Sequence, residues 1–333
     1  MMSKRHFEWR APVFAAAVVA VLCCGAALAE DLFEGAPAAP PGYENHKQAQ
    51  LAVMLGKVER VEEPETVPEG LVFHDDLEFA APEGKPLTLD LYVPEDAETP
   101  PPVMLFIHGG GWSKGNKEDY AFYNIAFAKR GYATASTQYR LSPEYHFPAA
   151  IQDVKCAIVW LKTHAEAYGF DASRMVLIGG SAGGHLSLLA GYSQDPALEC
   201  PDTPEGVDTR VQGIVNIYGV VDCTTPVAQE AHQVNDFIGK PYSEAADMYA
   251  LSSPIHHLDK DDPPTLTFHG TIDELVPVSQ ADTLHQKLDK LGVVNYYDRI
   301  EGWPHSMDVA KPINDRCRYI VARFLEKHLP LNP

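Results

Sequence analysis

Short apolar stretches alternate with amphipathic helical stretches over most of this chain, and this order constrains the fold more than any other feature. Continuous apolar strands are expected at 102–107, 132–137, 175–178, 211–217, 265–268 and 293–300. One intervening helix has an apolar stripe made of Ile151, Val154, Ala157, Ile158 and Leu161. Strands that are apolar on both sides need cover on both faces. The alternation therefore predicts an α/β fold with a mostly parallel central sheet and helices on both faces.

The first 29 residues have the pattern of a secretory signal peptide. Lys4, Arg5 and Arg10 precede the apolar run 11–28, which ends in the small-residue sequence 27–29. A retained membrane anchor is the alternative, but small residues dominate the end of the run, and roughly 20 strongly apolar residues are usually needed to span a bilayer. We therefore predict a signal peptide over 1–29 and export to the periplasm or beyond the cell, with no stable membrane anchor after cleavage.

The sequence predicts that an irregular segment after the signal peptide is followed by a compact domain that begins near residue 65. Prolines and glycines at 37–42 and again at 64–70 indicate a linker or N-terminal extension over 30–64. Residues 71–80 and 87–93 then read as an antiparallel pair of strands that leads into the parallel ones. The compact domain is expected to span 65–333.

Charge and cysteine content limit the partners of this chain. With 26 Lys and Arg against 46 Asp and Glu, the formal net charge is −20, which disfavours nucleic acid and anionic membranes. Cys23 and Cys24 fall in the signal peptide and do not follow the small-residue pair that a lipidated cysteine needs. The four remaining cysteines are Cys156, Cys200, Cys223 and Cys317. They can pair in three ways in an oxidising compartment, and neither the pairing nor the oligomeric state follows from the sequence.

The sequence Gly179-Gly180-Ser181-Ala182-Gly183 stands between an expected strand and an expected helix. This context predicts a nucleophile elbow, in which Ser181 occupies a strained turn and the glycines leave room for the chain to reverse. A Gly-rich turn that binds phosphate is the alternative, but no lysine follows within the turn and the glycine spacing of dinucleotide sites is absent. Ser181 is thus the candidate nucleophile.

A second glycine run, His108-Gly109-Gly110-Gly111-Trp112, directly follows the apolar strand that ends at residue 107. In a parallel sheet this loop lies at the same edge as the serine turn. Acyl transfer places negative charge on the former carbonyl oxygen, and each backbone amide aimed at it contributes about 3 kcal/mol. The amides of Gly110, Gly111 and Ala182 are the predicted donors of an oxyanion hole.

A serine hydroxyl needs a base, and the base needs an acid that holds its tautomer. Asp273 follows the strand 265–268, and Glu274 beside it is the fallback acid. His305 stands in the last strand-to-helix loop and follows the acid in the chain, as the order Ser, Asp, His requires for this type of fold. Ser181, Asp273 and His305 are therefore predicted to form a catalytic triad.

Other residues near these motifs have less specific interpretations. Trp112 and Trp303 stand close to the predicted oxyanion amides and to His305, so both are candidates for apolar walls of a substrate pocket; packing of the loops is an equal alternative. The pairs 256–257 (His-His) and 261–262 (Asp-Asp) are more often solvated or capping groups than metal ligands. We predict no metal and no cofactor.

Residues 219–263 interrupt the alternation. They contain no clear strand and two weak helical stretches, 229–238 and 243–251. We expect a small insertion near the active site, for which a partial lid is one interpretation.

Taken together, these motifs resemble the α/β-hydrolase fold, and within it the esterases related to hormone-sensitive lipase and to bacterial feruloyl and acetyl-xylan esterases. The resemblance covers about residues 70–328. Its most specific parts are the runs 108–112, 139–144, 147–149 with Asp153, and 180–184. Relatives of hormone-sensitive lipase commonly carry an acid before the nucleophile, where this chain has Gly180, which favours the feruloyl and acetyl-xylan side.

The resemblance implies a cofactor-free serine esterase that acts through an acyl-enzyme, with Ser181, Asp273 and His305 as nucleophile, acid and base. Arg140 could bind a substrate carboxylate, but the resemblance favours a structural ion pair with Asp153 or Glu144. Small neutral esters or acetyl and feruloyl groups on polysaccharides are the expected substrates. An arylformamidase or a peptidase with the same triad, and an inactive hydrolase domain used for binding, remain the alternatives.

Overall fold

The computed structural model describes residues 32–62, 64 and 66–332 of the chain. The chain divides into two units, 1–35 and 36–333. Only residues 32–35 of the first are described, so the predicted signal peptide lies outside the described residues. Among the described residues, no helix combines the length and apolar character that crossing a bilayer requires.

The centre of the second unit is one sheet of eight strands in the order β1-β2-β4-β3-β5-β6-β7-β8. The strands are β1 Leu71–Ala80, β2 Leu87–Pro94, β3 Pro102–Ile107, β4 Ala133–Thr137, β5 Asp171–Gly180, β6 Gly213–Ile217, β7 Thr265–Gly270 and β8 Asn295–Ile300. The β1–β2 and β2–β4 pairs are antiparallel, and all other pairs are parallel. The prediction of an antiparallel pair leading into a mostly parallel sheet is confirmed.

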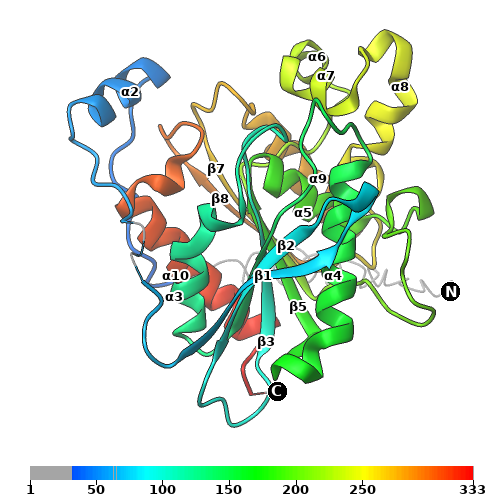
Figure 1. Cartoon of the computed structure of the whole chain (residues 1–333). Helices are drawn as coiled ribbons and strands as arrows, with labels where there is room; N and C mark the ends of the chain where they lie inside the picture. The colour runs from blue at the N-terminus through cyan, green and yellow to red at the C-terminus, as the bar shows by residue number, and fades with distance from the viewer. Residues whose placement is uncertain (1–31, 63, 65, 333) are drawn as a thin grey trace, which may run out of the picture. The chain divides into compact units, whose positions relative to one another are not determined.

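Helices cover both faces of this sheet (Figure 1). The α-helices of the second unit are α2 His46–Met54, α3 Ala121–Ala128, α4 Ala149–Tyr168, α5 Ala182–Tyr192, α6 Pro226–Glu230, α7 His232–Ile238, α8 Tyr242–Leu251, α9 Ser279–Leu291 and α10 Lys311–His328. Successive residues of a strand face opposite sides. On β6, Gly213 lies against Phe324 of α10, and Ile214 lies against Gly191 of α5. Helices α10 and α5 therefore pack on opposite faces.

The apolar stripe predicted from the sequence is the buried face of α4. All five of its side chains are fully buried: Ile151, Val154, Ala157, Ile158 and Leu161. They belong to one core cluster with β3 and β5 side chains such as Leu105 and Leu177. Burial of an aliphatic side chain contributes about 1.5–3 kcal/mol, so this stripe is a main reason why the helix docks on the sheet.

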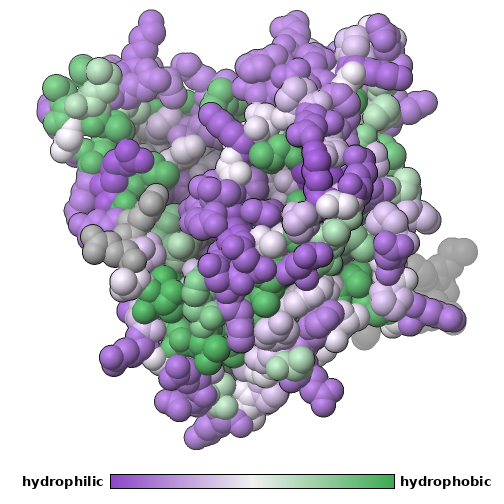
Figure 2. All heavy atoms as spheres, in the orientation of Figure 1, coloured by the Kyte–Doolittle hydropathy of each residue, from purple (hydrophilic) through white to green (hydrophobic). Residues whose placement is uncertain are grey.

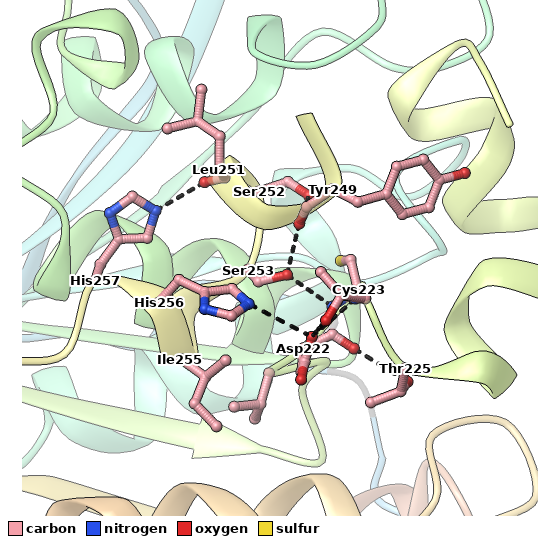
Figure 3. A network of polar contacts seen from close by, with 12 residues as sticks. Asp222, Cys223, Thr225, Tyr249, Leu251, Ser252, Ser253, Ile255, His256 and His257 are labelled. Carbon is pink, nitrogen blue, oxygen red and sulfur yellow. Dashed lines mark hydrogen bonds and ion pairs between the residues drawn. The ribbon is translucent and has the colours of Figure 1, made fainter. Parts of the chain in front are cut away.

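The insertion 219–263 contains the three short helices α6, α7 and α8, close to the two helical stretches that the sequence predicts. Its two ends are joined by hydrogen bonds, as Figure 3 shows. Ser253 Oγ accepts a hydrogen bond from the Cys223 amide at 2.8 Å and donates one to the Tyr249 carbonyl at 2.6 Å. The amides of Val221 and Asp222 donate to Oε1 of Gln280 on α9. Hydrogen bonds thus join the two ends of the insertion to each other and to helix α9.

Residues 36–62 differ from the linker that their prolines predict. They contain α2, and their backbone bonds to the C-terminal part of the domain: the Val61 amide donates to the Val309 carbonyl at 3.0 Å, and the Lys311 amide donates to the Glu59 carbonyl at 2.8 Å. The Tyr43 amide donates to the Gly302 carbonyl at 2.7 Å. Proline and glycine content indicates irregular backbone but not what that backbone contacts.

The structure selects one of the three cysteine pairings. Cys156 of α4 and Cys200 form a disulfide across a separation of 44 residues, whereas Cys223 and Cys317 are buried thiols. The bond joins α4 to the loop after α5. A salt bridge of 2.8 Å between Lys155 and Glu199 lies directly beside it.

We expect the Cys156→Ala/Cys200→Ala variant to lose about 3 kcal/mol of unfolding free energy, because the bridge restricts the unfolded chain over a long loop. Urea denaturation of both proteins with and without dithiothreitol measures the effect. The reductant should lower the midpoint of the wild type and leave that of the double variant unchanged. Equal midpoints for the oxidised wild type and the variant would contradict the prediction.

Candidate active site

Ser181 occupies a strained turn between β5 and α5. Its backbone has φ 56° and ψ −120°, values that a residue with a side chain rarely adopts. The turn is held by hydrogen bonds from the Ser181 amide to the Ile217 carbonyl and from the His185 amide to the Ser181 carbonyl, both 2.9 Å. A Cβ on Gly183 would lie 1.9 Å from the Ile107 carbonyl oxygen. Glycine is required there because β3 and the first turn of α5 are in contact.

The glycine run after β3 lies beside this turn. A Cβ on Gly109 would approach the Gly180 carbonyl oxygen to 2.9 Å. Gly110 and Gly111 have φ values of 99° and 61°. The Tyr139 hydroxyl donates to the carbonyls of His108 and Gly109 at 3.0 and 3.2 Å, which fixes the run.

The three predicted oxyanion donors lie along the same hollow as Ser181. Gly110, Gly111 and Ala182 all line a pocket of about 460 Å³ that also contains Ser181 and His305. Within the described part of the chain, no backbone carbonyl accepts a hydrogen bond from any of these three amides. The three amides are thus free of backbone acceptors among the described residues, as the donors of an oxyanion hole must be.

The structure brings Ser181, His305 and Asp273 into one hydrogen-bonded line. His305 Nε2 lies 2.9 Å from Ser181 Oγ, and Nδ1 lies 2.6 Å from Asp273 Oδ2. With Nδ1–H donating to the carboxylate, Nε2 is free to accept the serine proton. Glu274, the fallback acid, is exposed and does not share this contact.

Asp273 is buried, and its carboxylate accepts from several donors. Oδ1 accepts from the amides of Leu275 and Val276, both at 2.9 Å, and Oδ2 lies 3.4 Å from His269 Nε2. Burial raises the pKa of Asp273, but the contacts with His269 and His305 and the Val276 amide outweigh burial and lower that pKa to about 2. The acid therefore stays ionised over the whole range in which an imidazole titrates.

The ring of Tyr218 packs against His305, and Tyr218 is hydrogen-bonded to Asp308. Neither residue was predicted from the sequence. Tyr218 directly follows β6 with φ 45°, and its ring centroid lies 4.6 Å from that of His305. Its hydroxyl donates to the Asp308 carboxylate. Burial raises the pKa of Asp308, and the hydrogen bond from Tyr218 opposes that shift. The position of Tyr218 at the carboxyl end of a parallel strand was the available signal.

Trp112 lines the pocket and also ties the glycine run to the insertion. It is 2% exposed, stacks on Phe237 of α7 at 4.5 Å, and donates from Nε1 to His185 Nδ1 at 3.1 Å. His185 Nε2 in turn donates to the Ser252 carbonyl at 2.7 Å. Burial lowers the pKa of His185 to about 4, so the ring is neutral and can make both contacts. Both sequence interpretations of Trp112 thus find support.

Trp303 lies against the N-terminal segment. It is 4% exposed, does not line the pocket of Ser181, and lies against Tyr43 with ring centroids 5.6 Å apart. Its Nε1 donates to the Pro40 carbonyl at 3.2 Å. Of the two alternatives for Trp303, its contacts with Tyr43 and Pro40 are those of loop packing, and it lines a neighbouring hollow that also contains His305.

Two further groups of charged residues have structural contacts. Arg140 makes a bidentate ion pair with Asp153, with Nη2 at 2.8 Å from Oδ1, while Glu144 pairs with Lys85. His257 bonds to the Leu251 carbonyl at 2.8 Å, and Asp262 accepts from the Asp259 amide.

One acidic group among the described residues has the spacing to hold a metal ion: Asp75, Asp76 and Asp90. The ammonium of buried Lys117 lies 2.7 Å from Asp90 and 3.2 Å from Asp76. The lysine thus supplies the positive charge in this cluster.

The fold and the arrangement of its site are those of an α/β-hydrolase. Residues 89–288, more than half of the chain, match the model of the BD-FAE family. The chain therefore belongs to the BD-FAE family.

Individual relatives agree with this assignment. Esterase LipC of Mycobacterium tuberculosis is 33% identical over 60% of this chain, although the match spans only about half, 51%, of LipC itself. Ethyl acetate hydrolase of Pseudomonas putida is 28% identical over 76% of this chain and 82% of its own length. The structure of the thermophilic esterase Est2 of Thermogutta terrifontis matches with a TM-score of 0.69, covering 82% of this chain and 99% of Est2 at 24% identity, which establishes a shared fold.

The lowered pKa of Asp273 predicts an acid-sensitive contribution to stability. Because this pKa is about 2 in the folded protein against an ordinary value of 3.8, the contribution is complete above the ordinary value and is lost as the pH falls toward the folded one. The loss amounts to about 2 kcal/mol.

Denaturant unfolding at about pH 6 and about pH 2.5 tests this, because the lower pH lies between the ordinary and the folded pKa, where most of the contribution is already lost. Asp273→Asn should show a smaller difference in unfolding free energy between the two conditions than the wild type. Asp261→Asn, at an exposed aspartate, is the control and should behave as the wild type. An identical pH dependence for wild type and Asp273→Asn would refute the assignment.

Proposed function

We propose that this protein is an exported serine carboxylesterase that cleaves small or carbohydrate-linked carboxylic esters through an acyl-enzyme. The single observation that carries the proposal is the hydrogen-bonded line from Ser181 Oγ through His305 to the Asp273 carboxylate. The relatives Esterase LipC and ethyl acetate hydrolase support cleavage of the same type of bond.

In the proposed first half-reaction, Ser181 Oγ attacks the ester carbonyl carbon while His305 Nε2 takes the hydroxyl proton. The carbonyl oxygen becomes an oxyanion and accepts hydrogen bonds from the amides of Gly110, Gly111 and Ala182. The intermediate collapses, the bond from carbon to the alcohol oxygen breaks, and the alcohol leaves with the proton from Nε2. Asp273 stabilises the imidazolium and is not itself protonated.

In the second half-reaction, a water molecule attacks the acyl-enzyme and gives a proton to His305 Nε2. Collapse of this intermediate releases the carboxylic acid and returns the proton to Ser181 Oγ. The bond that breaks joins the acyl carbon of the substrate to its alcohol oxygen. Water is the only other reactant, and the enzyme returns to its starting state.

Small neutral esters, or acetyl and feruloyl esters of carbohydrates, are the proposed substrates. The net charge of −20 disfavours anionic ones. A pocket of about 460 Å³ is in the range of small-molecule sites, and the ethyl acetate hydrolase relative acts on an ester of this size.

Export of the mature protein is part of the proposal. It rests on the signal-peptide pattern of residues 1–29, and the disulfide between Cys156 and Cys200 supports it because such bonds persist in oxidising compartments.

The proposal is tested by assaying the mature protein and Ser181→Ala on p-nitrophenyl acetate, methyl ferulate, acetylated xylan and a peptide anilide. We expect ester turnover by the wild type and a loss of at least about a thousandfold in kcat for the variant, since the nucleophile is removed. Cleavage of the anilide in preference to the esters would indicate a peptidase. No turnover of any of the four would indicate a binding domain.

The choice of acid is tested by a matched pair of variants. Asp273→Asn should lower kcat for p-nitrophenyl acetate by about ten-thousandfold, because an amide cannot stabilise the imidazolium or hold its tautomer. Glu274→Gln changes an exposed neighbour and should leave kcat within about twofold of the wild type. The opposite ranking would make Glu274 the acid.

A further inference from the structure

The N-terminal helix α2 exposes an unusual amount of apolar surface. Nine large apolar side chains are exposed among the described residues, and five of them belong to this region: Leu51, Val53, Met54, Leu55 and Val309. Met54 is 83% exposed. Figure 2 shows this apolar cluster over α2, at the upper left of the view. A cluster of exposed apolar side chains indicates a binding site for a ligand, a membrane or another protein.

Part of this surface borders a hollow. A pocket of about 480 Å³ lies between α2 and the segment that carries His305. Its walls are mainly apolar and include Val53, Met54, Trp303, Met307 and Val309. We name this hollow the α2 pocket. A concave apolar site of this volume suits one alkyl chain or one aromatic ring better than a flat protein surface.

The α2 pocket adjoins the pocket of Ser181 at the histidine. His305 and Ser306 line both of them. The segment that builds the outer wall is joined to the His305 loop by the hydrogen bond from the Tyr43 amide to the Gly302 carbonyl and by packing of Tyr43 on Trp303. The two pockets therefore share the His305 loop as a common wall, and the contacts of Tyr43 hold that loop in place.

The proposed mechanism says which part of an ester reaches this side. The oxyanion donors Gly110, Gly111 and Ala182 line only the first pocket. The leaving alcohol oxygen must lie within hydrogen-bond reach of His305 Nε2, because that atom gives it a proton. The alcohol part of the ester is thus the part that passes the histidine toward α2.

We propose that the α2 pocket is the binding site for an apolar leaving-group alcohol, an alkyl chain or a single aromatic ring, of the ester substrate. This inference rests on the proposed esterase function and narrows it to small esters with an apolar alcohol, because the leaving alcohol of a carbohydrate ester is polar. The driving force is removal of the apolar alcohol group and of Val53 and Met54 from water. Leu51 and Leu55 are similarly exposed but do not line the pocket.

The test compares three esters: ethyl acetate, hexyl acetate, which extends the alcohol, and ethyl hexanoate, which extends the acyl group. We expect the wild type to prefer hexyl acetate to ethyl acetate in kcat/KM. In Val53→Gln/Met54→Gln this preference should fall about tenfold, because polar side chains replace the apolar wall. The relative rate of ethyl hexanoate should not follow it.

The control is Leu51→Gln/Leu55→Gln, which also replaces two exposed apolar side chains by glutamine on the same segment, but outside the pocket. It should keep the wild-type preference for hexyl acetate, and circular dichroism should show equal helix content in both variants. An unaltered preference in Val53→Gln/Met54→Gln would overturn the inference while leaving the esterase function intact. If the wild type cleaves no ester, both the function and the inference fail.

Other occupants of this surface give different results. A second copy of the chain would appear as a concentration-dependent change in mass by size-exclusion chromatography that both double variants abolish. A lipid surface would appear as binding to neutral phosphatidylcholine vesicles that both variants weaken. Either result without a changed alcohol preference would also overturn the inference.

Discussion

The contact between the end of β3 and the first turn of α5 is the constraint on which the site depends. Gly183 touches the Ile107 carbonyl, and this approach lets the chain reverse at Ser181 with its side chain at the sheet edge. Backbone strain of this kind costs roughly 1–3 kcal/mol and persists only where the surroundings impose it. Here the buried strands on both sides impose it. The same contact places the glycine run after β3 beside the serine.

A second set of interactions positions the histidine. Contacts with His269, His305 and the Val276 amide keep Asp273 ionised, so that its carboxylate orients His305 over the range in which an imidazole titrates. Tyr218 lies against the imidazole and is itself held by buried Asp308. On the far side, the N-terminal segment bonds to the loop between β8 and His305. The histidine loop is therefore supported by parts of the chain that are far apart in sequence.

Local patterns were enough to predict much of this molecule. The stripe on α4 follows from helical periodicity, and the sheet follows from strands that are apolar on both sides. The strand-turn-helix context of Ser181 is enough to predict its turn from the sequence, because few local structures tolerate five such small residues. Tyr218, Asp308 and the role of residues 36–62 were missed, since no short pattern marks a side chain whose importance comes from its neighbour in space.

By itself, the sequence determined the α/β architecture, the edge of the sheet at which the site forms, and the order in which Ser181, Asp273 and His305 follow one another. Each of these follows from local motifs and from their order along the chain. Only the tertiary structure decided that Asp273 and not Glu274 meets His305, that Cys156 pairs with Cys200, and that Trp303 faces the N-terminal segment. Such choices depend on which side chains come within a few ångströms of one another after folding. Residues of the same chemical type, such as two neighbouring carboxylates or several cysteines, cannot be told apart by sequence in this respect.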